Sequence, residues 1–155
     1  MRGAKLTVAV SQMKFRETIR ENVAWITSTI QASARAGADV VLFPECALTG
    51  YNRNFLAIAR IELDAARATL AAVARAAHCN VLVGGPTFIR KNRFNSLLIY
   101  DRHGHEVFCY SKIHLTPRDA RYFKPGNRLA FFHLDCIPCT AIICHAIGQF
   151  HLAGH

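Results

Sequence analysis

Three side chains that could take part in covalent catalysis stand far apart in the sequence: Glu45, Lys112 and Cys144. Each directly follows a run of apolar, aromatic or β-branched residues that is typical of a strand. Open α/β sheets place their functional groups at the carboxyl ends of strands, so residues distant in sequence can converge there. The three positions therefore predict one site built at the ends of three strands.

A cysteine, a carboxylate and a lysine in one site can break a carbon–nitrogen bond. A thiolate attacks a carbonyl or nitrile carbon, while a carboxylate accepts the thiol proton and later passes protons to the leaving amine. An ammonium group stabilises the developing negative charge and lowers the pKa of a nearby thiol. Each residue also has a simpler interpretation: Glu45 as a loop carboxylate, Lys112 as a solvated surface charge, and Cys144 as a buried core cysteine.

The first part of the chain has the pattern of strand, helix, strand. Residues 6–10 are rich in β-formers and lead into polar residues, which predicts a strand followed by a loop. Apolar residues at helical spacing over 19–30 predict a helix that Gly37 ends. Residues 40–43 form a continuous apolar run, typical of a strand buried on both faces, and Pro44 ends it because proline cannot donate to the ladder.

The second part continues the alternation and then changes to paired strands. Gly84 and Gly85 are expected to end one strand, and the turn at 101–105 to join a hairpin. The predicted elements are a helix over 63–77 and strands over 81–83, 95–100, 106–111, 129–134 and 140–144. This order predicts an α/β fold in which helices pack on a sheet.

Length and composition indicate a single domain over residues 1–155, with 52% hydrophobic and 19% charged residues. No apolar run approaches the ~20 residues of a membrane-spanning helix. The short strand-like run near the N-terminus is not a secretory signal, so the chain is expected to be cytoplasmic. Its six cysteines are then expected to stay reduced. Four of them are interpreted as small buried hydrophobic residues: Cys46, Cys79, Cys109 and Cys136.

The chain is basic, with 19 Lys and Arg against 10 Asp and Glu and a formal net charge of +9. Such a balance can mark a nucleic-acid-binding protein. Here the basic residues are scattered, with no dense cluster beyond residues 90–93 and no aromatic ladder beside them. This distribution favours a solvated surface over a nucleic-acid partner.

The residues that flank the three candidates resemble the signatures of a known family. Residues 41–51 contain Glu45 and residues 142–145 contain Cys144. Residues 111–115 contain Lys112, and residues 122–127 follow it. In this order they are similar to the three signatures of the nitrilase superfamily, the carbon–nitrogen hydrolases. The resemblance runs from residue 5 to residue 145. The chain is identified on these motifs as an N-terminal portion of a member of that family.

The resemblance implies a role for each candidate: Glu45 as general base, Lys112 as oxyanion stabiliser and Cys144 as nucleophile. It implies a thioester intermediate, a small amide, carbamoyl amine or nitrile as substrate, and no metal or organic cofactor. It also implies a four-layer αββα sandwich, of which this chain holds only part. Copies of the chain are expected to associate into a homo-oligomer, and no membrane partner is expected.

A second carboxylate often lies between the lysine and the Phe-x-Pro-Gly segment in this family. Asp119 is the candidate for that place, one methylene shorter than glutamate. Its alternative interpretation is a solvated loop charge beside Arg118 and Arg121.

The chain departs from the family pattern after His145, where residues 146–155 lack the expected continuation. These residues are interpreted as a non-family tail on a truncated domain, and a catalytically inactive fragment or pseudoenzyme is one alternative. Another alternative is a small zinc- or nucleic-acid-binding module, because two Cys and two His near the C-terminus come close to zinc-finger spacing. The residues of that spacing are Cys136, Cys139, His151 and His155. The apolar β-branched run between the two pairs argues against a finger.

Overall fold

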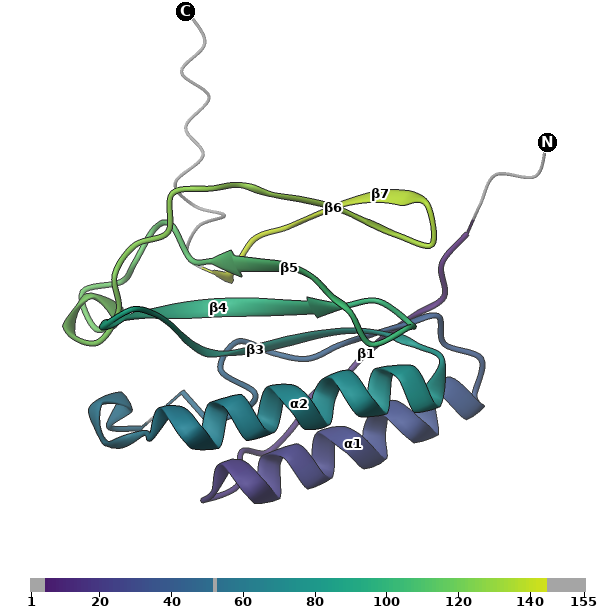
Figure 1. The fold of residues 1–155 in the computed structure, drawn as a ribbon, viewed down its shortest axis with the longest axis horizontal. Helices are drawn as coiled ribbons and strands as arrows, with labels where there is room; N and C mark the ends of the chain where they lie inside the picture. The colour runs from purple at the N-terminus through teal and green to yellow at the C-terminus, as the bar shows by residue number, and fades with distance from the viewer. Residues whose placement is uncertain (1–4, 52, 145–155) are drawn as a thin grey trace, which may run out of the picture.

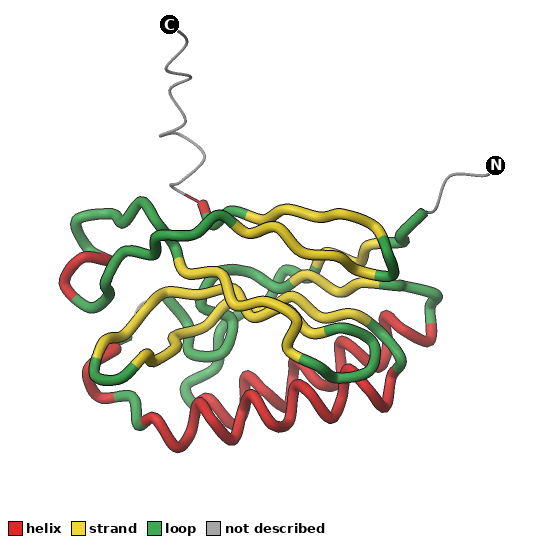
Figure 2. The backbone as a smooth tube through the Cα atoms, turned by 45° about the horizontal axis from the view of Figure 1, so that its top comes forward, coloured by secondary structure: helices red, strands yellow, loops and turns green. Residues whose placement is uncertain are grey.

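The computed structural model describes residues 5–51 and 53–144, which form three layers (Figures 1 and 2). Two helices, α1 (Ile19–Arg35) and α2 (Arg60–Ala77), cover one face of a five-stranded sheet, and a two-stranded hairpin lies over the other face. The strands are β1 (Val8–Val10), β2 (Val40–Leu42), β3 (Asn80–Ile89), β4 (Asn92–Tyr100), β5 (Glu106–Ser111), β6 (Ala130–Leu134) and β7 (Ile137–Ala141). This arrangement confirms the predicted α/β fold class.

The direction of the strands brings two of the predicted strand ends to one edge of the sheet. The strand order is β1-β2-β3-β4-β5, in which β1, β2 and β3 run parallel and β4 and β5 each run antiparallel to their predecessor. β5 therefore runs in the same direction as β2. Glu45, which follows β2, and Lys112, which follows β5, lie at the same edge as a result.

β3 is longer than the sequence predicted. It continues through Gly84 and Gly85 and pairs with β4 as far as Ile89, opposite Asn92. The chain then reverses at Arg90, whose φ of 55° is in the left-handed region. The prediction that the glycines end the strand was wrong, because the ladder with β4 outweighs the weak strand preference of glycine.

Both helices lie where the sequence predicted them, although α2 begins at Arg60, three residues before the predicted start. α1 begins at a capping box, in which the Thr18 hydroxyl accepts from the Glu21 backbone N–H (3.1 Å) and the Glu21 carboxylate accepts from the Thr18 N–H (3.0 Å). It ends before Gly37, whose φ of 88° suits glycine. α2 ends at His78, which takes a left-handed conformation. The buried faces of both helices pack on β2, β3 and β4, so they hold the middle of the sheet.

The hairpin of β6 and β7 forms a second core on the opposite face of the sheet. Phe132 and Leu134 pack with Ile99 and Tyr110 there. The two strands are joined by Asp135 and Cys136, both at positive φ (48° and 65°). Two consecutive left-handed residues are characteristic of the tight hairpin turn whose twist matches the flanking strands.

The last strand is placed differently from the prediction. β7 covers residues 137–141, whereas the apolar run had predicted 140–144. The turn at Asp135 and Cys136 sets the register, pairing Ile137 with Leu134 and leaving Ile142 and Ile143 beyond the ladder. Cys144 therefore follows the strand at a distance of three residues instead of ending it.

A polar cluster holds the tip of the hairpin at the end of the sheet where β3 begins, opposite to the end that carries Glu45. The Asp135 carboxylate accepts hydrogen bonds from Arg102 Nε (2.6 Å) and Asn80 Nδ2 (2.9 Å), and the second guanidinium nitrogen also contacts it. Arg102 additionally lies 3.5 Å from an Asp39 oxygen. These contacts join the hairpin to the start of β3 and to the β4–β5 turn. Hydrogen bonds from Arg102 are the main cause of the lowered pKa of Asp135.

The cysteines divide between core and surface. Cys46 and Cys79 are buried, as predicted, but Cys109 and Cys136 are exposed, so that part of the prediction was wrong. Cys109 lies on β5, the edge strand of the five-stranded sheet, and Cys136 lies in the hairpin turn.

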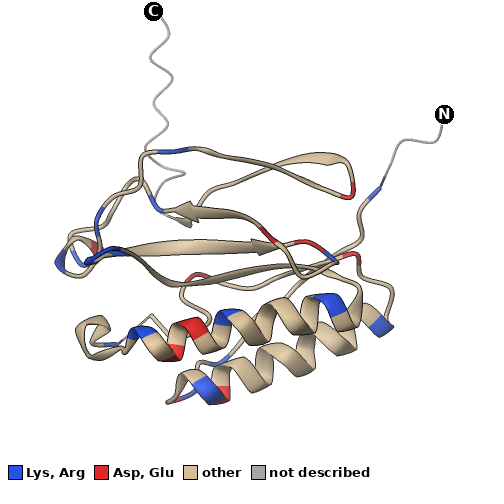
Figure 3. Ribbon diagram, viewed as in Figure 1, with Lys and Arg blue, Asp and Glu red and all other residues tan. Residues whose placement is uncertain are grey.

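Two further surface features follow from the described residues. Lys and Arg are spread over both helices and several loops in Figure 3, in line with the scatter in the sequence. Within the described part of the chain, neither helix is long and apolar enough to cross a membrane.

Candidate active site

Glu45 is held on a loop that crosses directly over β3. After β2 the Phe43 N–H donates to the Leu82 carbonyl (2.8 Å), and the chain then turns away at Pro44. Gly84 lies under this turn: a Cβ there would stand 2.4 Å from the Pro44 carbonyl oxygen and 2.6 Å from the Cys46 nitrogen. Real Cβ atoms do not approach backbone so closely, so the loop position depends on glycine.

Lys112 is a buried cation at the end of β5. Its backbone N–H donates to the Asn95 carbonyl (2.8 Å), and its own carbonyl accepts from the Gly126 N–H (2.9 Å). The Lys112 side chain is fully buried, and Nζ lies 2.7 Å from Glu45 Oε1 and 2.8 Å from Asp119 Oδ2. The interpretation of Lys112 as a solvated surface charge is therefore wrong.

Asp119 is the second partner of Lys112 and lies in a short 3-10 helix, Asp119–Arg121. It is only 1% exposed, so it is not a solvated loop charge. Its Oδ1 accepts from the Tyr51 hydroxyl (2.7 Å), and its Oδ2 accepts from Lys112 and from the Thr116 N–H (3.3 Å). Both carboxylate oxygens of Asp119 are thus occupied by donors.

Electrostatics hold this cluster in its charged form. Burial by itself lowers the pKa of Lys112, but hydrogen bonds to Asp119 and Glu45 outweigh it and raise the pKa above its usual value. For Asp119, burial raises the pKa, and the hydrogen bonds from Lys112 and Tyr51 more than compensate, so the pKa is lowered. Lys112 and Asp119 are thus both stabilised in their charged forms.

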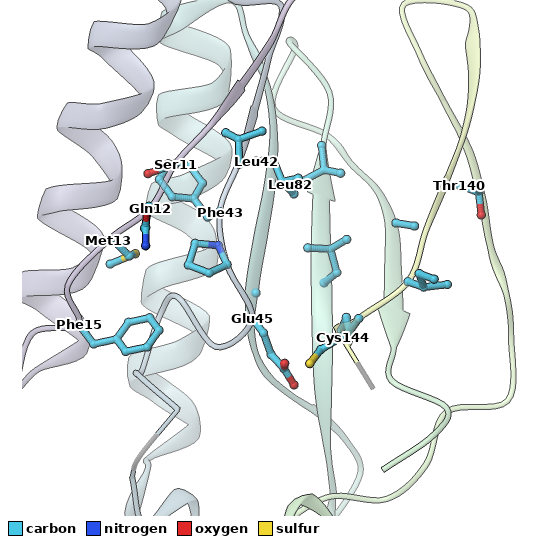
Figure 4. A pocket seen from close by; sticks show the side chains of 17 residues that line it. Ser11, Gln12, Met13, Phe15, Leu42, Phe43, Glu45, Leu82, Thr140 and Cys144 are labelled. Carbon is cyan, nitrogen blue, oxygen red and sulfur yellow. The ribbon is translucent and has the colours of Figure 1, made fainter. Parts of the chain in front are cut away.

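Cys144 reaches the same region from the hairpin. Together with Glu45 it lines a cavity of about 690 Å³ between β2 and the segment that follows β7. Figure 4 shows the Cys144 sulfur and the Glu45 carboxylate directed toward each other at one end of this cavity. Cys144 is exposed and has a φ of 40°, so it is not the buried core cysteine of the simpler interpretation. No hydrogen bond joins its thiol to Glu45, Lys112 or Asp119.

The rest of the cavity wall is mostly apolar. It is formed by residues of β1 and the loop that follows it, of β2, β3, β4 and β7, and of the segment after β7. Members of this wall include Met13, Phe15, Leu42, Leu82, Leu97 and Ile143. An apolar wall with one carboxylate and one thiol at its end is the usual composition of a small-molecule site.

Two polar residues that sequence reasoning missed complete the cluster. Tyr51 donates to Asp119, as described above, and Asn95 Nδ2 donates to Glu45 Oε1 (2.7 Å). Asn95 is fully buried in β4, beside Ser96 and ahead of the apolar residues 97–100. Four of the nine residues of β4 are polar, so the sequence of the strand does not single out Asn95.

The zinc interpretation receives no support from the described residues. Cys136 and Cys139 lie at the tip and in the second strand of the hairpin, whereas His151 and His155 fall outside the described residues. Across residues 5–51 and 53–144, no group of three or more His, Cys, Asp or Glu side chains could hold a metal ion.

Replacing Asp119 with asparagine is expected to alter the acid sensitivity of folding. A carboxyl with a lowered pKa binds fewer protons when folded, so it adds stability above its unfolded pKa of about 3.9 that is lost as the pH falls through its folded pKa. The difference in free energy of unfolding between the parent and Asp119→Asn should therefore shrink as the pH falls below about 4. Urea unfolding at several pH values measures this. Asp64→Asn, at an exposed helix pair with Arg60, is the control and should show a much smaller pH-dependent difference.

Comparison with known proteins assigns the chain to a family. The carbon–nitrogen hydrolase family profile matches residues 7–152, which includes part of the segment 146–155 that was predicted to depart from the family. That segment lies outside the described residues. No curated protein matches the chain.

Several solved structures share the fold. An amidase from Nesterenkonia sp. superimposes with a TM-score of 0.86 at 22% identity, covering 95% of this chain and 58% of the amidase. A variant of that amidase with acrylamide added at its active-site cysteine gives a TM-score of 0.85 at 20% identity, with coverages of 92% and 59%. The glutamine-dependent NAD+ synthetase from Acinetobacter baumannii gives 0.85 at 21% identity, with coverages of 93% and 28%.

The chain spans about 58% of the length of the first of these amidases. The fold match confirms that two helices on a mixed five-stranded sheet reproduce part of the nitrilase fold. With the family profile covering nearly all of the sequence, the chain belongs to the carbon–nitrogen hydrolases of the nitrilase superfamily.

Proposed function

We propose that this chain carries the catalytic site of an amidase-type hydrolase that cleaves a small amide, carbamoyl amine or nitrile through a thioester on Cys144. The observation that carries the proposal is the buried Lys112, bonded to both Glu45 and Asp119, with Glu45 sharing a cavity with Cys144. A buried cation with two carboxylates is costly to assemble for stability alone, which favours a functional role.

Glu45 serves as the general base in this proposal. Its Oε1 accepts from Lys112 and Asn95, while no hydrogen bond joins its Oε2 to another described residue. Oε2 is therefore the oxygen that takes the Cys144 proton. Both oxygens of Asp119 already accept hydrogen bonds, so Asp119 holds Lys112 in place.

For an amide, the reaction proceeds in two halves. The Cys144 sulfur bonds to the carbonyl carbon as its proton moves to Glu45, and the oxygen takes up negative charge. Lys112 has three N–H donors, two of which go to Glu45 and Asp119, so the third is available to that oxygen. The carbon–nitrogen bond then breaks as Glu45 returns the proton to the amine. Water attacks the thioester with Glu45 as base, releasing the acid and restoring the thiol.

The reactivity of Cys144 tests the site directly. Cys136 and Cys144 are both exposed, so exposure alone predicts similar labelling by iodoacetamide, whereas the pKa of Cys109 is raised, mainly by desolvation, which makes that thiol a slower reference. If Glu45 accepts its proton, Cys144 should react about tenfold faster or more at neutral pH. Peptide mapping over time measures the three rates in one sample. Equal rates at the three thiols would contradict the assignment.

Turnover is tested by ammonia release from a simple aliphatic amide such as butyramide. Release that disappears in Cys144→Ala would support the hydrolase. A related amidase has been seen with acrylamide added at its active-site cysteine, so acrylamide is a suitable second probe. A Cys144 adduct without ammonia release would favour the alternative of a catalytically inactive chain that retains the site.

A further inference from the structure

Asn95 contacts Glu45, Cys46 and the backbone of Lys112 from one buried position on β4. Its Nδ2 donates to Glu45 Oε1 (2.7 Å), and its Oδ1 accepts from the Cys46 thiol (3.7 Å). Its backbone carbonyl accepts from the Lys112 N–H (2.8 Å). The side chain is fully buried. One residue thus touches the base, the residue after the base, and the backbone that carries the lysine.

The orientation of the Asn95 amide follows from its partners. An ionised carboxylate only accepts hydrogen bonds, so the amide NH₂ group faces Glu45. The Cys46 thiol is a weak donor, and it meets the amide oxygen at the other end. Cys46 is held in turn by a left-handed backbone (φ 55°) in the loop that crosses Gly84. The amide therefore cannot rotate without losing partners at both ends.

The two donors on Glu45 determine which of its oxygens remains free. Lys112 and Asn95 approach Oε1 from different strands, β5 and β4, and a carboxylate held at one oxygen by two donors has its plane fixed. With Lys112 alone, the carboxylate could rotate about its terminal bond and exchange its two oxygens. Fixing the plane leaves Oε2, which accepts no hydrogen bond from another described residue, as the oxygen available to the cavity that Glu45 and Cys144 line.

We propose that Asn95 is a positioning residue for the general base: its amide holds the Glu45 carboxylate so that Oε2 faces the Cys144 thiol. This inference rests on the proposed function, because it needs Glu45 to be the base. Asn95 touches neither substrate nor the reacting sulfur, so it acts through Glu45. A misplacement of about 1 Å at a catalytic group can cost about a hundredfold in rate.

The groups that surround Glu45 determine how replacing Asn95 with a side chain of the same shape would affect the Glu45 carboxyl. Lys112 contacts it directly, Asp119 lies behind Lys112, Cys46 is its neighbour in the loop, and Cys144 stands across the cavity. Asn95→Asp has the shape of asparagine but places a third carboxyl beside one ammonium. Like charges oppose ionisation of both carboxyls. The rate of Cys144 modification falls as the pH is lowered, and in Asn95→Asp this fall should therefore begin at a higher pH.

The test measures the rate of Cys144 modification by iodoacetamide against pH on the full chain. Asn95→Asp is expected to move the fall in rate to higher pH and to slow the reaction about tenfold at neutral pH. Ser96→Ala is the matched control, because Ser96 is the next residue on β4 and equally buried, and its hydroxyl bonds to Thr87 (2.7 Å) and Ser111 (3.2 Å) rather than to Glu45. It should keep the parental profile even if it lowers stability. A shift of equal size in Ser96→Ala would overturn the inference.

Two more variants separate the inference from the function on which it rests. Glu45→Gln removes the base; if it leaves the rate unchanged, the proposed function and the role of Asn95 both fail. If Glu45→Gln slows the reaction but Asn95→Asp keeps the parental profile, only the role of Asn95 fails.

Should Asn95→Asp not fold, Asn95→Ser provides the test. It loses the donor to Glu45 without adding charge, and is expected to slow the reaction about tenfold. A parental rate in that variant would overturn the proposal.

Discussion

Replacing Lys112 with methionine is expected to lower the free energy of unfolding by about 3–5 kcal/mol, which is the cost of breaking a buried ion pair by removing one partner. Methionine nearly fills the same volume, so the loss comes from the charges rather than from a cavity. Glu45 and Asp119 would be left facing one another with their shared cation gone. A domain of this size has about 5–15 kcal/mol of total stability, so the variant would be close to unfolding.

Urea unfolding of Lys112→Met measures this loss, with Lys124→Met as the control. Lys124 is exposed, and its replacement should change stability by less than about 0.5 kcal/mol. In the double variant Lys112→Met, Asp119→Asn, one of the two uncompensated carboxylates is gone, so part of the stability should return. A double variant as unstable as Lys112→Met alone would contradict the charge explanation.

Replacing Gly84 with alanine is expected to displace the Glu45 loop. The new Cβ would stand within 2.4–2.8 Å of the Pro44 oxygen, the Cys46 nitrogen and the Glu45 Cα, all of them backbone atoms. Overpacking of this kind costs about 1–3 kcal/mol, and a shift of about 1 Å at a catalytic group can cost about a hundredfold in rate. The rate of Cys144 modification should fall by that order, and unfolding measures the loss of stability.

Gly85→Ala makes the same substitution one residue further along β3. There the added Cβ meets the Leu48 side chain, with Cδ1 at 2.7 Å, rather than the backbone beside Glu45. It is expected to cost stability while leaving Cys144 modification close to the parental rate. If Gly85→Ala slowed that reaction as much as Gly84→Ala, the effect would belong to the strand as a whole and not to the loop.

The strand ends that carry Glu45 and Lys112 could be predicted from the sequence. A buried parallel strand is a continuous apolar run, which Pro44 ends, and Lys112 directly follows the strand-like residues 106–111. Asp119 could be proposed only from the family resemblance. Its burial depends on Tyr51 and Lys112, which are 68 and 7 residues away along the chain.

The roles of Gly84 and Asn95 could not be predicted in the same way. The weak strand preference of glycine predicts a strand end at Gly84. In the structure the strand continues, and the missing side chain lets the backbone of the Glu45 loop pass at close range. The shift of β7 has a similar origin. Its register is set by the left-handed turn at Asp135 and Cys136, and Ile142 and Ile143 are as apolar as the residues of a strand. Such features depend on contacts between segments, which local composition does not record.

The contact between Arg102 and Asp135 also indicates the order in which the parts of the site are expected to form during synthesis. Glu45, Lys112 and Asp119 all precede the hairpin in the chain, and the strands and loops that hold them need no residue beyond Gly126 for their backbone contacts. A chain that folds from its N-terminus during synthesis is thus expected to complete the carboxylate–lysine cluster first. The thiol arrives only when Asp135 reaches Arg102 and closes a loop of the chain. A nascent chain would therefore form the carboxylate–lysine cluster before Cys144 reaches it.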